Sequence, residues 1–208
     1  MVLKYMKYQK GFTLIELLVS MSVLLVISGI SASLFVSAIL EQRRILARQG
    51  LYGQLSYALE YMSKSMRMAG RDLTGDCLGA EGRNFLLTRQ DTAGSGEYLG
   101  IKFINQSDNN ICQEFFLDKD EADLSKPAIL KVARDLETPI ALTSNKIKIN
   151  SLRFIINSNV GGGTITYSSE TDDIQSRITI LLDAELVELI SQPIKIQTTV
   201  SQRNINIR

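Results

Sequence analysis

Histidine is absent from all 208 residues, and this absence limits the chemistry that the side chains could perform. This absence excludes a Ser-His-Asp triad, a Cys-His pair and the common His-ligated zinc sites. Serine with lysine, paired carboxylates and tyrosine remain as candidate catalytic groups, but none stands in a recognisable local pattern. We therefore expect no catalytic residue, no metal and no cofactor, and a protein that is not an enzyme.

One carboxylate has an unusual position. Glu16 is the only charged residue between Lys10 and Glu41, and it directly precedes the 24-residue apolar run Leu17–Leu40. As a helix rising about 1.5 Å per residue, this run would be about 36 Å long, enough to cross a hydrocarbon layer of about 30 Å. A carboxylate costs roughly 2.5–3.5 kcal/mol at mid-membrane, so we expect Glu16 to have a partner.

The stretch Lys10-Gly-Phe-Thr-Leu-Ile-Glu16, followed by a long apolar helix, resembles the cleavage and methylation signature of type IV prepilins and type II secretion pseudopilins. The resemblance implies a structural subunit of a pilus or secretion filament. It implies that prepilin peptidase cuts between Gly11 and Phe12 on the cytoplasmic face and that Phe12 is then N-methylated. It also implies a single-pass protein of the cytoplasmic membrane, leader inside and head outside, that later joins a cell-surface or periplasmic filament.

The resemblance also gives Glu16 a role in subunit assembly. Cleavage creates an amino group at Phe12, and Glu16 of one subunit is expected to pair with the Phe12 amine of a neighbour. A desolvated carboxylate left unpaired is penalised by several kcal/mol, so the pair sets the register. The expected partners are other pilins or pseudopilins, the peptidase and the assembly platform. The alternative is that Glu16 only reaches toward the lipid headgroups.

An ordinary secretory signal is the competing interpretation of the amino terminus. Leu17–Ile27 could act as its hydrophobic region and Ser31-Ala32-Ser33 as its cleavage site. The product would be an exported or membrane-anchored β-domain, a binding module or an enzyme. Against this, the apolar run continues to Leu40 and Glu16 stands where the hydrophobic region should begin. The positive charges on both sides of the run permit the pilin topology without requiring it.

Overall charge gives no indication of nucleic-acid binding. The chain has 23 basic and 22 acidic residues, for a net charge of +1. Removing residues 1–11, with Lys4, Lys7 and Lys10, would leave 20 basic residues against 22 acidic ones, a net charge of −2. A near-neutral chain lacks the electrostatic footprint of a nucleic-acid-binding protein.

The helical pattern continues beyond the apolar run. Apolar residues recur at helical spacing along one stripe, which consists of Leu51, Leu55, Leu59, Met62, Met66 and Ala69. This predicts one near-continuous helix from about Thr13 to Ala69, with Gly70 as its C-cap. The chain then divides into a leader (1–11), a helix (12–70, with a membrane span at 17–40 and an amphipathic half at 41–69) and an extracytoplasmic head (71–208).

Two further segments resemble a smaller group within this family, the minor pilins. Gln54–Gly70, which ends in Met-Ala-Gly and is followed by Cys77, is similar to the corresponding stretch of PilW-type minor pilins. The segment Lys195–Asn204 is similar to the closing strand of minor pilins. Pseudopilin J proteins are the nearer alternative.

After Arg71 the hydrophobic period changes from helical to alternating, which predicts β-strands. The expected strands are Asn84–Thr88, Tyr98–Ile104, Ile111–Leu117, Ala128–Ala133, Lys146–Asn157, Thr164–Tyr167, Arg177–Leu182 and Ile194–Val200. A parity change predicts a bulge near Asn150-Ser151, and Gly161-Gly162-Gly163 reads as a turn. The predicted fold is α+β and pilin-like, with one long helix packed on a mostly antiparallel sheet.

The head contains both cysteines, Cys77 and Cys112. Their number and place suit a disulfide in an oxidising compartment, and two separate buried thiols are the alternative. The acidic segment Asp118–Asp123 suggests calcium, but it lacks the glycine and terminal glutamate of a helix-loop-helix site, so a solvated loop is favoured. Asp172-Asp173 reads as a charged hairpin tip. There is no glycine-rich phosphate loop.

Overall fold

The computed structural model describes residues 11–91, 97–119, 126–135, 137–157, 176–187 and 193–203. The chain forms two compact units, Met1–Ala47 and Arg48–Arg208. Within the described residues, the first unit is the amino-terminal part of one helix and the second is the head. The helix continues into the head and supplies part of its core.

The helix α1 runs from Leu14 to Arg67, which confirms the continuous helix expected from the sequence. The expected C-cap at Gly70 is wrong. Ala69–Gly70 forms the short strand β1, and Gly70 does not have the positive φ of a left-handed cap. A Cβ at this position would lie 2.6 Å from Nε2 of Gln106, so the Gln106 side chain would have to move to admit a larger residue. The surroundings of Gly70 are therefore set by a side chain that is distant in the sequence.

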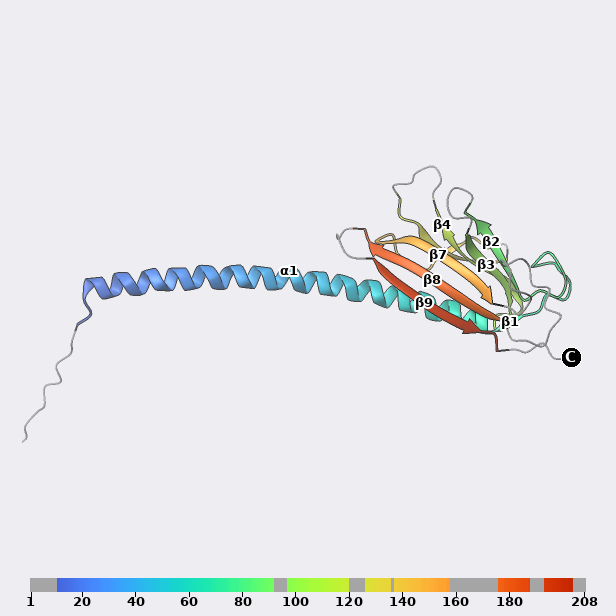
Figure 1. The fold of residues 1–208 in the computed structure, drawn as a ribbon, viewed down its shortest axis with the longest axis horizontal. Coiled ribbons are helices and arrows are strands. Elements are labelled where there is room, and N and C mark those ends of the chain that lie inside the picture. Colours follow the sequence, from blue (N-terminus) through green and yellow to red (C-terminus); the bar gives the residue numbers. More distant parts are fainter. Residues whose placement is uncertain are drawn as a thin grey trace, which may run out of the picture. The chain divides into compact units, whose positions relative to one another are not determined.

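The first sheet of the head is antiparallel and has the order β1-β3-β4-β5-β6, with β2 also paired to β3 (Figure 1). Its other strands are β2 (Phe85–Gln90), β3 (Tyr98–Asn105), β4 (Ile111–Asp118), β5 (Ile129–Arg134) and β6 (Ile140–Ala141). The strands expected from alternation between residues 84 and 133 correspond to β2 to β5. The strands β1 and β6 have two residues each, too few to produce an alternating pattern.

The second sheet is an antiparallel meander with the order β7-β8-β9. Its strands are β7 (Ile147–Asn157), β8 (Arg177–Leu186) and β9 (Ile194–Ser201). The pairing of β7 with β8 shifts register between Ile149 and Ser151, which confirms the predicted bulge. The expected turn at 161–163, the strand at 164–167 and the acidic tip at 172–173 lie outside the described residues.

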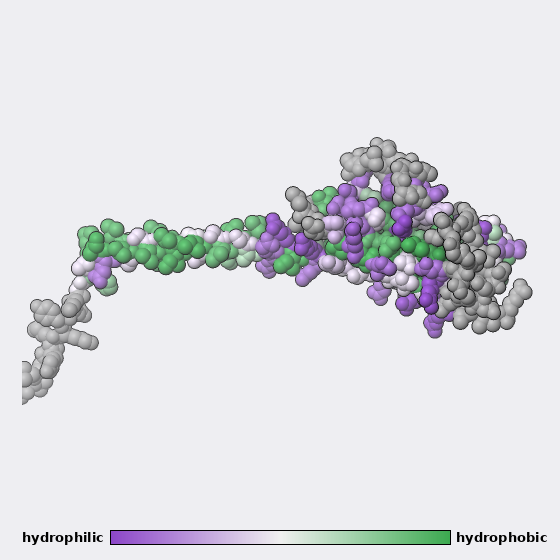
Figure 2. Space-filling model, in the orientation of Figure 1, coloured by the Kyte–Doolittle hydropathy of each residue, from purple (hydrophilic) through white to green (hydrophobic). Residues whose placement is uncertain are grey.

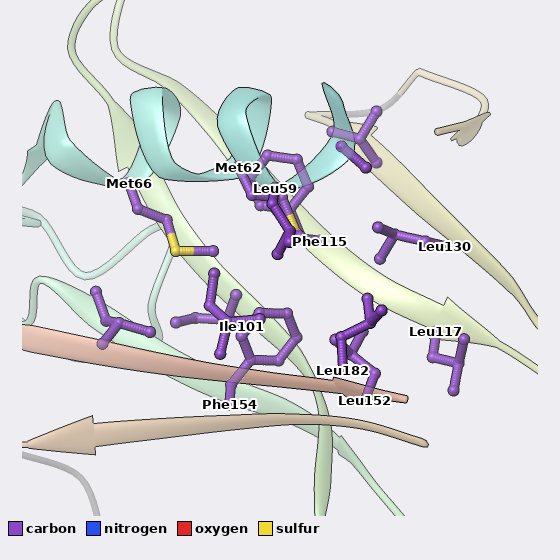
Figure 3. Close-up of a cluster of buried hydrophobic side chains, with 14 of the residues drawn as sticks. Leu59, Met62, Met66, Ile101, Phe115, Leu117, Leu130, Leu152, Phe154 and Leu182 are labelled. Carbon is purple, nitrogen blue, oxygen red and sulfur yellow. The ribbon is translucent and has the colours of Figure 1, made fainter. Parts of the chain in front are cut away.

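The helix stripe and the inner faces of both sheets form one hydrophobic core. Figure 3 shows Leu59, Met62 and Met66 extending from α1 toward Phe115 of the first sheet. Phe103 lies between Phe85 and Phe115, with ring centroids 5.9 and 5.8 Å away. This packing of one long helix on antiparallel sheets is the α+β, pilin-like architecture predicted from the sequence.

Candidate functional site

The first turn of α1 is closed by a reciprocal pair of hydrogen bonds. The backbone N–H of Glu16 donates to Oγ1 of Thr13, at 3.3 Å. In return, the backbone N–H and the hydroxyl of Thr13 donate to Oε2 of Glu16, at 3.3 and 3.2 Å. This is a capping box, in which two backbone donors that lack partners inside the helix are satisfied by side chains.

The capping box gives the Glu16 carboxylate a defined direction. It is turned back toward the N-terminal end of the helix, where the helix dipole favours negative charge. Gly11 and Phe12 directly precede this turn, and the Phe12 side chain is 82% exposed. The structure thus brings Glu16 together with Thr13, whereas no hydrogen bond joins Glu16 to Phe12 among the described contacts.

Thr13 is the residue that the sequence analysis did not single out. The sequence nevertheless contains the pattern that predicts this role: Thr13-x-x-Glu16 before an apolar run is the pattern of a capping box. The same residues belong to the stretch that resembles the prepilin signature, so the two patterns overlap on one carboxylate.

The apolar part of α1 satisfies its own polar side chains. Every serine hydroxyl in the run donates to a carbonyl oxygen three or four residues earlier in the helix. These serines are Ser20, Ser22, Ser28, Ser31, Ser33 and Ser37. Such internal hydrogen bonds lower the cost of placing a hydroxyl in hydrocarbon.

This part of the helix has exposed apolar side chains at consecutive positions and therefore on all sides. Figure 2 shows those on the visible face. Among the described residues, α1 is long and apolar enough to cross a membrane by length and composition. The apolar belt ends at Glu41, which forms an ion pair with Arg44 at 2.6 Å.

Comparison with known protein families gives a match in the same amino-terminal region. Residues 6–32 match the family model described as the prokaryotic N-terminal methylation motif. The methylation motif covers Gly11, Phe12 and Glu16 and continues into the apolar run. Together with the fold, it supports a type IV pilin-like protein, suggests a structural protein that assembles with other pilins, and is consistent with membrane anchoring through α1. No curated protein and no solved structure matches the chain.

The head contains a second well-ordered polar centre, around Asp72. Its carboxylate accepts hydrogen bonds from the backbone N–H groups of Leu78 (2.7 Å), Gly75 (2.8 Å), Cys77 (3.0 Å) and Thr74 (3.2 Å). Burial alone would raise the pKa of this carboxyl, but the four hydrogen bonds outweigh burial and hold the pKa below its usual value. Asp72 therefore stays ionised and organises the loop that follows α1.

A disulfide attaches this loop to the first sheet. Cys77 in the loop and Cys112 in β4 are joined, with their Cα atoms 5.7 Å apart. The pairing is the one expected from the sequence. The backbone N–H of Cys112 also donates to Oδ1 of Asp135, at 2.8 Å. The loop, β4 and the residue after β5 are thus tied together.

A cavity of about 670 Å³ lies beside the disulfide. The residues that line it include Asp76, Glu114, Asp135 and Lys102. Within the described part of the chain, no group of three or more histidine, cysteine or acidic residues has the geometry to hold a metal. Of the acidic segment at 118–123, for which the sequence favours a solvated loop over a calcium site, residues 120–123 lie outside the described residues, and Asp118 is paired with Lys131.

Proposed function

We propose that the protein is a structural subunit of a type IV pilus or a type II secretion-like filament, in the role of a minor pilin or pseudopilin. Prepilin peptidase cuts it between Gly11 and Phe12, and Phe12 is then N-methylated. The single observation that carries the proposal is the methylation motif at the start of a helix that is apolar on all sides. Such a helix has to be covered by lipid or by other helices.

Assembly follows from the chemistry at the first turn. Before assembly, the capping box directs the Glu16 carboxylate toward the cut end of the chain. Cleavage would place a cationic amine on Phe12. When the subunit leaves the lipid and enters a filament, Glu16 pairs with the Phe12 amine of a neighbouring subunit, because an unpaired charge between packed helices is costly.

The remaining assignments complete the proposal. Residues 1–11 form a cytoplasmic leader, residues 12–70 the membrane and assembly helix, and residues 71–208 an extracytoplasmic head. Partners are other pilins, the peptidase and the assembly platform. Within the superfamily, a PilW-type minor pilin is supported by the sequence Met-Ala-Gly at 68–70, directly after α1, and by the following cysteine, Cys77. The disulfide fits export to an oxidising compartment.

The decisive experiment is mass spectrometry of the amino terminus of the protein purified from its native host. The expected mature chain begins with N-methyl-Phe12. A chain that still begins at Met1, or that begins near Leu34, would show an uncut anchor or an ordinary signal peptide.

Substitution of Glu16 tests the assembly step separately. Glu16→Ala and Glu16→Gln are both expected to be cleaved and methylated but to be lost from filaments. The glutamine variant is the sharper one, because glutamine can keep the capping box but cannot form an ion pair. Immunoblots of sheared filaments measure incorporation. Normal incorporation of Glu16→Gln would contradict the pairing with the Phe12 amine.

A further inference from the structure

The cavity beside the disulfide lies between the loop that follows α1 and the face of the first sheet opposite to the core. On the sheet side it is lined by Lys102 and Ile104 of β3 and by Glu114 of β4. These residues alternate along their strands with core residues such as Phe103 and Phe115, so their side chains point away from the core. On the other side the cavity is lined by loop residues between 72 and 77. A volume of about 670 Å³ is in the range of sites for small molecules.

The walls of this cavity are fixed by bonds within the head. The carboxylate of Asp72 accepts four backbone hydrogen bonds and so orders the loop. The disulfide between Cys77 and Cys112 attaches the loop to β4. Asp135 is held beside Cys112, because its backbone N–H donates to the Cys112 carbonyl at 2.7 Å and its Oδ1 accepts from the Cys112 N–H at 2.8 Å. A ligand would thus enter a preformed cavity, which lowers the ordering cost of binding.

Within the described part of the head, three charged groups at the cavity have no charged partner. Lys102 is half-buried, and its amine forms no hydrogen bond or ion pair with a described residue. The same holds for the Asp76 carboxylate. Asp135 uses only Oδ1 in the hydrogen bond given above, and no described contact engages its Oδ2. Glu114 differs from these groups, because it is paired with Arg89 at 3.1 Å. The cavity therefore offers one ammonium group and two carboxylates to a ligand.

The ammonium group and the two carboxylates come from different parts of the cavity wall. Asp76 directly precedes Cys77 in the chain. Asp135 pairs with Cys112, so both carboxylates belong to residues beside the disulfide. Lys102 is on β3, across β4 from Asp135. Because neighbouring strands lie about 4.8 Å apart, the backbones of Lys102 and Asp135 are about 10 Å apart across the sheet. A ligand that meets both charges has to carry its own charges at two separate ends.

We propose that this cavity binds a short peptide with free ends, whose carboxylate meets Lys102 and whose ammonium group meets Asp76 and Asp135. Charge-assisted hydrogen bonds at the two ends of the peptide would engage all three groups. A metal ion would engage only the carboxylates, and within the described residues no acidic group has the geometry to hold one. Ile104 and Ala133 add an apolar part to the lining, which suits small apolar side chains. The inference uses the head alone and does not depend on the function proposed above.

Blocked peptides test whether both ends are recognised. Trialanine is the probe, because its ends carry both charges and its side chains are small and apolar. In nuclear magnetic resonance titrations of the isotope-labelled full chain in detergent micelles, trialanine at millimolar concentration should shift the amide signals of residues that line the cavity. Acetylated trialanine lacks the ammonium group and trialanine amide lacks the carboxylate. Each blocked peptide should bind at least tenfold more weakly, the loss expected for one charge-assisted hydrogen bond.

Three results of this titration would overturn the proposal. The first is the absence of shifts at the cavity with trialanine. The second is equal affinity for trialanine and either blocked peptide, which would mean that one end is not recognised. The third is equal affinity for trialanine and free alanine, which would mean that the two charges are not read at separate ends.

Substitutions assign each end of the peptide to its side chain. Lys102→Gln should weaken trialanine about tenfold and leave the affinity for trialanine amide unchanged. Asp135→Asn keeps an oxygen acceptor for the Cys112 N–H and should weaken trialanine without changing the affinity for acetylated trialanine. The matched control is Lys148→Gln, since Lys148 is paired with Glu185 in the second sheet, and it should bind like the wild type. If Lys102→Gln weakened trialanine and trialanine amide equally, Lys102 would not meet the carboxylate and the proposal would be wrong.

Discussion

At the scale of single residues, Glu16 shows how one carboxylate can be tolerated beside an apolar helix. Its hydrogen bonds from Thr13 satisfy part of its acceptor capacity, and its place in the first turn uses the favourable end of the helix dipole. Both effects act within a single chain, before any partner is present. A capping box and an intermolecular ion pair are therefore compatible uses of the same side chain at different stages.

Asp72 is a buried carboxylate of the head. Its pKa is lower in the folded chain than the unfolded value of about 3.9, so its ionised form stabilises the fold. This stabilising contribution is present above about pH 4 and is lost as the pH falls through the pKa of the folded state. We expect Asp72→Asn to lower the free energy of unfolding by about 1–3 kcal/mol at pH 7, because backbone donors lose a charged acceptor.

The pH dependence of the unfolding free energy distinguishes the contribution of Asp72 from the contributions of the other carboxylates. The difference in unfolding free energy between the wild type and Asp72→Asn should be constant from pH 7 to pH 5 and should shrink below pH 4. Urea unfolding followed by the near-ultraviolet signal of the head measures it. A difference that stayed constant down to pH 2 would mean that the carboxylate contributes only as an uncharged hydrogen-bond acceptor.

At the scale of elements, α1 is joined to the first sheet by a polar chain as well as by the hydrophobic stripe. The Tyr61 hydroxyl accepts hydrogen bonds from Nη2 of Arg134 (2.6 Å) and Nε2 of Gln113 (3.4 Å). Gln113 is fully buried and accepts in turn from Nδ2 of Asn105, at 2.8 Å. The hydrogen bond with Tyr61 raises the pKa of Arg134, so the guanidinium stays charged in this contact. The edge-to-face contact of Tyr61 with Phe115 completes the junction.

Removal of the Tyr61 hydroxyl should therefore destabilise the head. Tyr61→Phe keeps the ring contact with Phe115 but leaves a buried amide donor of Gln113 without its acceptor, at a cost of about 1–3 kcal/mol. Tyr57→Phe is the matched control, because Tyr57 is 64% exposed and should change stability by less than about 0.5 kcal/mol. Urea unfolding compares the two variants. Equal stability of both would show that the helix is held by apolar packing alone.

The helices and strands that could be predicted are those whose hydrophobic residues repeat regularly within one continuous segment. The stripe from Leu51 to Ala69 and the alternation in β3, β4 and β8 determine which faces are buried, and the parity change in β7 located its bulge. The polar chain from Tyr61 could not be predicted, because its members come from separate elements and meet only in the folded head. The error at Gly70 has the same origin, since Gln106 approaches it from another part of the chain.

The candidate site was predictable for a different reason. Gly11, Phe12 and Glu16 are neighbours in the sequence, so no tertiary contact is needed to place them together. The cysteine pair could be proposed from number and location, but its geometry depends on how the loop after α1 packs on β4. The orientation of the Glu16 carboxylate toward Thr13 required the structure, although the residue spacing already contained the pattern.

At the scale of the whole molecule, the two units depend on different sources of stability. The apolar part of α1 has exposed side chains and complete internal hydrogen bonding, so it needs an apolar environment rather than contacts with the rest of its own chain. The head has its own core and a disulfide across a sequence separation of 35 residues. Loss of the disulfide should therefore affect the head and leave the membrane helix unchanged.

The double variant Cys77→Ser/Cys112→Ser tests this separation. The loop-closure entropy of such a crosslink corresponds to about 4 kcal/mol of stability. For a unit of this size, that loss would lower the melting temperature by about 10 °C. In detergent micelles, the near-ultraviolet signal of the head should melt earlier, whereas the far-ultraviolet helical signal of the apolar segment should persist through the transition. Because Asp72 still accepts its four backbone hydrogen bonds, the loop should keep its local structure without the disulfide. Simultaneous loss of both signals would show that the two units unfold as one.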